Sequence, residues 1–125
     1  MTGRRAGRRT AFFLLYQWDV TGQPLASLYE GEIDPFAREL AEAVVARAPE
    51  IDREITEAAE GWTAERLGAV ERAILRIGVH ELEGESVPTE VAIDEAVTLA
   101  KRYASEDAGR LVNGILGRIA RERAA

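Results

Sequence analysis

The stretch VERAILRIGVHEL, residues 70–82, carries a clear helical pattern. Its apolar side chains recur every three or four residues, which places them on one face of a helix. The pattern extends back through Leu67 towards Thr63, a suitable N-terminal cap, and Gly68 can separate a short turn from the longer helix. We expect this segment to be the central helix of the protein, with a buried stripe formed by Leu67, Val70, Ile74 and Ile77.

The sequence before residue 49 predicts two helices. The first runs from the arginines near the N-terminus to about Val20, and the residues TGQP at 21–24 end it. The second begins at Asp34 and Pro35, a cap followed by a proline at the first helical position, and ends near Ala48. Their expected buried faces are Ala11, Leu14, Leu15 and Trp18 in the first helix, and Phe36, Leu40 and Val44 in the second.

Two more segments flank the central helix. Pro49 can begin a third helix that ends at Gly61, with Ile51, Ile55 and Ala59 on one face, and we expect Trp62 to fill the core. On the other side, Gly84 and the Val-Pro step at 87–88 predict a loop. The helix after this loop is expected to bury Val91 or Ala92, Ala96, Leu99 or Ala100, and Tyr103.

The last predicted helix begins at Ser105, a good cap, and continues to the arginine-rich C-terminal residues. Asn113 and Gly114 both weaken helix propensity, so we expect them to make a buried polar contact or a close packing contact. The apolar positions of this helix are Leu111 or Val112, Ile115, Leu116 and Ile119. Taken together, the pattern predicts one all-α domain over residues 1–125, with about six helices and no repeats.

Composition narrows the function classes. The chain has 125 residues, no cysteine and one histidine, so it has no thiolate or histidine cluster for a metal, and we expect neither a metal nor a cofactor. The apolar residues 11–16 are too few for a membrane span or signal peptide and are followed by Gln17 and Asp19. We therefore expect a soluble, cytoplasmic protein that makes no membrane contact.

Charge is distributed unevenly along the chain. The net charge is −6, yet residues 1–10 carry four arginines and no acid, and residues 101–125 carry six basic and three acidic side chains. Cations at a helix N-terminus oppose the helix dipole, so a bound phosphate would stabilise these arginines; a merely solvated terminus is the alternative. The acidic middle, residues 11–100, suits a second, basic partner.

Three blocks of the sequence resemble the NusB family of bacterial transcription antitermination factors. They are RRAGRR…LYQWDVTG at 4–22, VERAILRIGVHEL at 70–82, and VPTEVAIDEAVTLAKRYASEDAGRLVNGIL at 87–116. The resemblance implies an all-α fold of six to seven helices in two packed sub-bundles, without catalytic activity. It also implies binding of single-stranded boxA RNA together with NusE, a small-subunit ribosomal protein, in an antitermination complex with RNA polymerase on ribosomal RNA operons.

The same resemblance implies which side chains contact RNA. Arginines would neutralise phosphates, a tyrosine could stack on a base, and carboxylates could accept hydrogen bonds from base amino groups. The residues that match are Arg4, Arg5, Arg8, Arg9, Tyr16, Glu71 and Asp107, and the nearby Lys101, Arg102 and Arg110 would extend the cationic track.

Simpler roles stay open for several of these residues. Tyr16 could be a packing residue, Glu71 a solvated one, and Asp107 a favourable charge beside Ser105 at a helix start. Leu111 stands where the family commonly has phenylalanine, and its apolar side chain is assigned to the NusE-binding face. His80 stands where the family commonly has tyrosine, and we expect it to pack rather than to bind a ligand.

Two other functions fit the same pattern. The protein could be a self-associating homodimer whose RNA surface is covered, because periodicity identifies an apolar face but not what covers it. It could also be an RNA-binding module like the N-terminal domain of ribosomal RNA cytosine methyltransferases. The sequence contains no glycine-rich cofactor loop, P-loop or catalytic cysteine, so we do not expect an enzyme.

Overall fold

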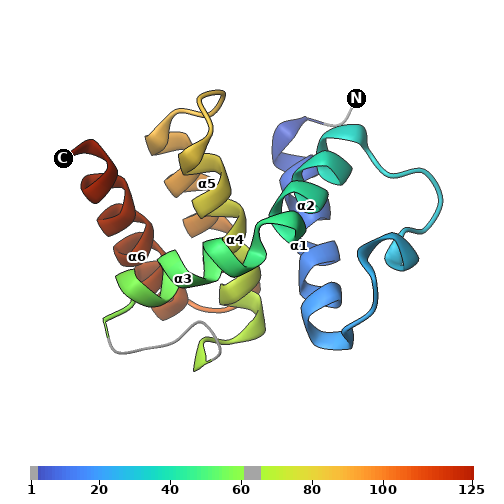
Figure 1. Cartoon of the computed structure of the whole chain (residues 1–125), viewed down its shortest axis with the longest axis horizontal. Helices are drawn as coiled ribbons and strands as arrows, with labels where there is room; N and C mark the ends of the chain where they lie inside the picture. The colour runs from blue at the N-terminus through green and yellow to red at the C-terminus, as the bar shows by residue number, and fades with distance from the viewer. Residues whose placement is uncertain (1–2, 61–65) are drawn as a thin grey trace.

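The computed structural model describes residues 3–60 and 66–125, and these form helices without any strand (Figure 1). The all-α fold class is confirmed. The core role predicted for Trp62 and the cap predicted at Thr63 lie outside the described residues. The helices are α1 (Arg4–Thr21), the 3-10 turn η1 (Leu25–Leu28), α2 (Pro35–Ala46), α3 (Ala48–Ala58), α4 (Ala69–Glu83), α5 (Thr89–Tyr103) and α6 (Glu106–Ala124).

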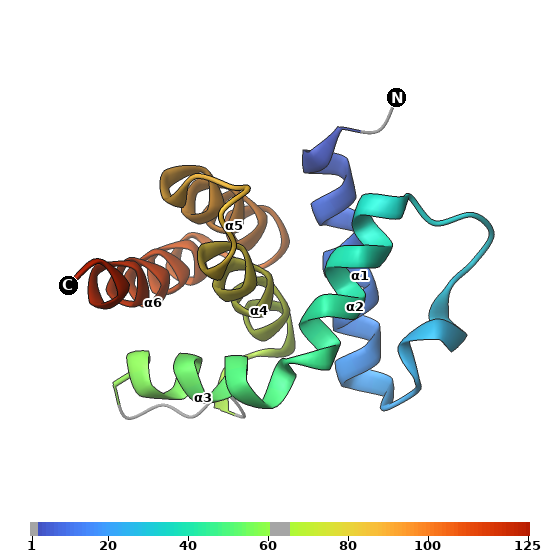
Figure 2. The same ribbon diagram turned by 45° about the horizontal axis from the view of Figure 1, so that its top comes forward.

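Helix α4 is the central helix that the sequence predicts. It packs against α1 and α2 on one side and against α3, α5 and α6 on the other, which gives the two expected sub-bundles (Figures 1 and 2). Ile74 and Leu75 in its middle are completely buried. No helix in the described parts of the chain is long and apolar enough to cross a membrane.

Local sequence signals explain where the helices begin. Asp34 Oδ2 accepts a hydrogen bond from the Ala37 amide at 3.2 Å, directly before Pro35 opens α2. Ser105 Oγ accepts one from the Ala108 amide at 3.0 Å at the start of α6. Each cap satisfies a backbone N–H that the helix itself leaves unpaired. Both predicted caps are therefore confirmed.

The burial pattern shows which residue of each predicted pair of alternatives is buried, and it corrects one prediction. Ala92, Ala100 and Val112 are buried, while their alternatives Val91 and Leu111 are exposed and Leu99 is only partly buried. Asn113 and Gly114 are both exposed, and a side chain added at Gly114 would meet nothing within 4 Å. The prediction of a buried contact at these two residues was wrong, because the helix tolerates weak helix formers on its solvent face.

Partly buried ion pairs connect α1 to the centre of the fold. Arg76 on α4 donates to Asp52 of α3 at 2.8 Å and to Asp19 of α1 at 3.2 Å, and its guanidinium lies 5.4 Å from the Trp18 ring. Arg72 donates to the same Asp19 carboxylate at 2.7 Å. These contacts attach the C-terminal end of α1 to the start of α4.

A second network joins the ends of α3, α4 and α6. Glu83 accepts hydrogen bonds from Arg47 and, at 2.7 Å, from Arg123, which also donates to Glu54 at 2.7 Å. Burial alone would raise the pKa of Glu83, but hydrogen bonds led by the one from Arg47 outweigh it and lower that pKa to about 2. Glu83 is therefore charged at neutral pH and holds the two arginines in place.

Candidate RNA-binding surface

The arginines at the start of α1 divide into exposed and buried side chains. Arg4 is exposed, and its guanidinium lies 5.5 Å from the centre of the Phe36 ring. The Arg5 side chain is 78% exposed, and its Nε donates to Glu95 of α5 at 3.2 Å. The first turn of α1 contains no acid and no side-chain cap. The unpaired backbone N–H groups at this end of α1, together with the arginine side chains beside them, thus favour a bound anion.

Arg8 departs from the expectation of a phosphate contact at the surface. Its side chain is 5% exposed, and its Nε donates to both carboxylate oxygens of Glu81 on α4 at 2.9 Å. Glu95 lies 3.7 Å from the same guanidinium. The charge of Arg8 is therefore matched inside the protein, and this residue joins α1 to α4 and α5.

Arg5, Arg9 and Arg102 form what we call the arginine cluster. These side chains line one hollow between α1 and α5, together with Arg8, Glu95, Thr98 and Leu99. Arg5 and Arg9 lie one helical turn apart on α1, so they face the same side of the helix. Glu81 neutralises Arg8, and Glu95 is the one carboxylate among the residues that line this hollow, so the three arginines of the cluster leave it with a positive charge.

The other predicted cations and Asp107 lie near the junction of α5 and α6. Lys101 is exposed, and its Nζ lies 3.9 Å from Glu106. Arg110 donates to Asp107 one turn away in the first turns of α6, and both side chains are exposed. Asp107 also lies in the first turn of that helix, where a carboxylate is favourable, so its carboxylate has a local role even without RNA. Leu111 is 37% exposed on the next turn.

Glu71 lies far from the arginine cluster. It belongs to the first turn of α4, and its carboxylate lies close beside Gly68. The next residue, Arg72, contacts Asp19 at the opposite end of α1 from Arg5. Fourteen residues of helix correspond to a separation of about 20 Å between Arg5 and that end. Tyr16 is partly buried against the core, between these two ends of α1.

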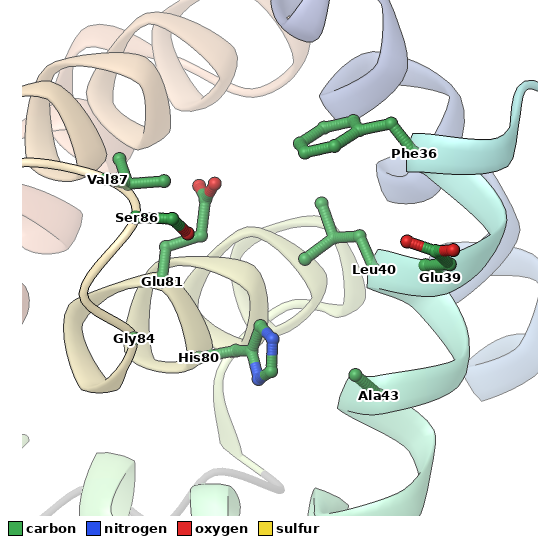
Figure 3. A pocket seen from close by; sticks show the side chains of 9 residues that line it. All are labelled: Phe36, Glu39, Leu40, Ala43, His80, Glu81, Gly84, Ser86 and Val87. Carbon is green, nitrogen blue, oxygen red and sulfur yellow. The ribbon is translucent and has the colours of Figure 1, made fainter.

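A separate hollow between α2 and the end of α4 has a different character (Figure 3). It contains none of the predicted RNA-binding residues, and the carboxylates of Glu39 and Glu81 line it, so it does not suit a phosphate. His80 points its ring towards α2 with a buried, unpaired Nδ1, and burial followed by the charge of Arg47 lowers its pKa. In the described residues no group of three or more His, Cys, Asp or Glu side chains could hold a metal ion.

Sequence reasoning missed two features of this surface. The carboxylates Glu81 and Glu95 pair with the N-terminal arginines, although they lie more than 70 residues away in the chain. Phe13 is 42% exposed and contacts Tyr103 of α5, with their ring centres 5.2 Å apart. A signal for Phe13 exists in the sequence, because it follows Arg9 by four residues and so lies on the same side of α1.

Comparisons with known proteins agree with this architecture. A transcription antitermination protein NusB from Saccharopolyspora erythraea is 41% identical, with 96% of this chain and 88% of that protein aligned. One from Rubrobacter xylanophilus is also 41% identical, over 90% of this chain and 86% of that protein. The structure of T. maritima NusB is 36% identical with a TM-score of 0.87, covering 97% of this chain and 92% of that one.

A crystal structure of the antitermination factors NusB and NusE in complex with dsRNA contains a similar chain. That chain is 32% identical, with a TM-score of 0.82, and the similarity covers 95% of this chain and 96% of that one. The model of the NusB family matches residues 5–121. With nearly the whole chain matched in both sequence and fold, the protein belongs to the NusB family.

Proposed function

We propose that this protein is a transcription antitermination factor that binds single-stranded boxA RNA together with NusE. In this role it acts in the cytoplasm with RNA polymerase on ribosomal RNA operons, and no chemical step is involved. The observation that carries the proposal is the arginine cluster of Arg5, Arg9 and Arg102, which lies beside the cationic start of α1 in a member of the NusB family. A related NusB has been crystallised with NusE and dsRNA, which supports NusE and RNA in general as partners.

The roles of individual residues follow from their surroundings. The arginine cluster and Arg4 neutralise phosphates, since their guanidinium groups reach the surface or line the hollow. Arg8 is left out of this set because its side chain is buried against Glu81, whereas the Arg5 side chain stays exposed although it pairs with Glu95.

The junction of α5 and α6 extends this surface. Lys101 and Arg110 are exposed and prolong the cationic track, and the exposed carboxylate of Asp107 can accept a hydrogen bond from a base amino group. Leu111 gives NusE an apolar contact.

Tyr16 and Glu71 can contact the same RNA as the arginine cluster only if that RNA extends along α1. A single strand that begins at the arginine cluster must cover about 20 Å to reach the start of α4. Glu71 would then contact either the far end of the RNA or NusE bound beside it. The acidic middle of the chain supports a basic ribosomal protein as that neighbour.

The test is fluorescence anisotropy of a labelled single-stranded boxA RNA, with and without purified NusE, at several salt concentrations. The variant Arg5→Glu/Arg9→Glu should weaken binding of every RNA sequence. It should also reduce the slope of log K against log salt by about 1.4, since each lost phosphate contact on a single strand contributes about 0.7. Arg53→Glu is the control for a charge reversal elsewhere, because Arg53 is an exposed arginine on α3 away from the cluster.

Each outcome has a clear meaning. Tighter binding in the presence of NusE, lost in the double variant but kept in Arg53→Glu, supports the proposal. An equal loss in both variants would mean that general charge rather than this cluster attracts the RNA. Absence of binding by the unmodified protein, with or without NusE, would contradict the proposed function.

A further inference from the structure

Three aromatic rings meet next to the arginine cluster. The ring centres of Phe12, Phe13 and Tyr103 lie 5.1 to 5.2 Å from one another, and Phe13 meets Tyr103 edge to face at an interplanar angle of 78°. The Arg102 guanidinium lies 5.3 Å from the centre of the Tyr103 ring. We call these three rings the aromatic cluster.

The aromatic cluster is anchored on one side and open on the other. Phe12 is buried in the core and Tyr103 is partly buried, while Phe13 is 42% exposed. A ring held by two others keeps its orientation, so little conformational entropy is lost when a flat ligand stacks on it. The cluster therefore has the properties of a stacking platform.

The chemistry around the platform identifies the ligand. Arg9 precedes Phe13 by one helical turn on α1, and Leu99 precedes Tyr103 by one turn on α5, and both Arg9 and Leu99 line the hollow of the arginine cluster. A ligand that fits has an anion for the arginines and a flat ring about one helical turn further along, roughly 6 Å away. A nucleotide of single-stranded RNA combines these two groups.

Other exposed apolar side chains lack this setting. Val20 on α1 and Val91 on α5 are also exposed, but they are aliphatic, and isolated exposed apolar residues are common on protein surfaces. Phe13 instead adds to an aromatic cluster beside three arginines.

We propose that Phe13 and Tyr103 form a stacking site for one unpaired nucleobase, whose adjacent phosphate is bound by Arg9 and Arg102. The site rests on the proposed RNA-binding function and adds a base contact to it. Because every base has an aromatic face, this contact strengthens binding without fixing the sequence. It also favours single-stranded over fully paired RNA, since a base within a duplex is already stacked on both faces.

The test combines protein variants with abasic RNA. Phe13→Leu keeps an apolar side chain but removes the ring, and Val20→Ala is the control for an exposed apolar residue on the same helix. In the anisotropy assay with boxA RNA, Phe13→Leu should bind about 5- to 140-fold more weakly, the cost of losing one stacked base. The salt slope should stay unchanged, because no phosphate contact is lost, and Phe13→Tyr should bind normally.

Abasic substitution then locates the base. One abasic position should weaken binding to the unmodified protein and have no further effect on Phe13→Leu. Circular dichroism melting confirms that each variant is folded. Equal affinity of Phe13→Leu and the unmodified protein would overturn the stacking site while leaving RNA binding intact. Loss of NusE binding alone in Phe13→Leu would assign the platform to the protein partner, and absence of RNA binding by the unmodified protein would overturn both proposals.

Discussion

Replacing Arg8 with methionine should destabilise the protein strongly without removing a phosphate contact. The side chains of Arg8 and Glu81 are each 5% exposed, and Arg8 Nε donates to both carboxylate oxygens at 2.9 Å. Arg8→Met keeps much of the side-chain volume but leaves Glu81 buried without its partner. Breaking a buried ion pair in this way costs about 3–5 kcal/mol.

Arg5→Met is the matched control on the same helix. Arg5 also pairs with a carboxylate, that of Glu95, but its side chain is 78% exposed. Exposed ion pairs contribute about 0–1 kcal/mol, so this variant should unfold almost like the unmodified protein. For a chain of this size 1 kcal/mol corresponds to roughly 4 °C in Tm, so Arg8→Met should melt about 12–20 °C lower.

Urea unfolding and RNA anisotropy measured on both variants test this reasoning. Arg8→Met should lower the free energy of unfolding but bind RNA normally while folded. Arg5→Met should leave the free energy of unfolding almost unchanged but bind RNA more weakly. The double variant Arg8→Met/Glu81→Met should recover much of the lost stability, because it removes both buried charges. A normal melting temperature for Arg8→Met together with a large loss of RNA affinity would refute the internal role of Arg8.

Three further predictions concern packing, pH and charge. Gly78→Ala should lower the free energy of unfolding in urea by about 1–3 kcal/mol, because the new Cβ would lie 2.6 Å from Leu116. Gly114→Ala should raise it by about 0.5–1 kcal/mol, because a Cβ there meets nothing within 4 Å and alanine favours the helix. Glu83 has a pKa lowered to about 2 from an ordinary 4.5, so its stabilising effect should be complete above pH 4.5 and be lost as the pH falls towards 2. Urea titrations across that range should show a weaker pH dependence for Glu83→Gln, and an unchanged dependence would count against the network. Glu95→Gln removes the carboxylate 3.2 Å from Arg5 and should strengthen RNA binding up to about 5-fold in the anisotropy assay.

The sequence predicts the helices well because helix formation depends on nearby residues. The caps at Asp34 and Ser105 act over three residues, and both form as expected. The central stripe around Ile74 repeats within one helix, so its burial also follows from spacing alone. Asn113 and Gly114 show the limit of this reasoning, because helix propensity gives the cost of a residue in a helix but not whether another helix covers it.

The site could be predicted only in part, because its partners are distant in the chain. Helical spacing could have placed Arg8 on the buried face, since Ala11 and Leu15 follow it by three and seven residues. It could not have identified Glu81, which lies 73 residues away. The contact of Phe13 with Tyr103 likewise depends on how α5 packs beside α1, which no local pattern specifies.

The two sides of α1 thus perform different tasks with the same residue type. On one side Arg8 shares a buried face with Ala11 and Leu15, and its charge is matched within the fold. On the adjacent side Arg5 and Arg9 line the hollow with charges that RNA phosphates can match. Arg5 and Arg9 lie only three residues and one residue from Arg8 in the chain. Their different roles therefore follow from the helical period, which turns Arg8 alone towards α4. We therefore expect stability and RNA affinity to be separable by substitutions within two turns of one helix.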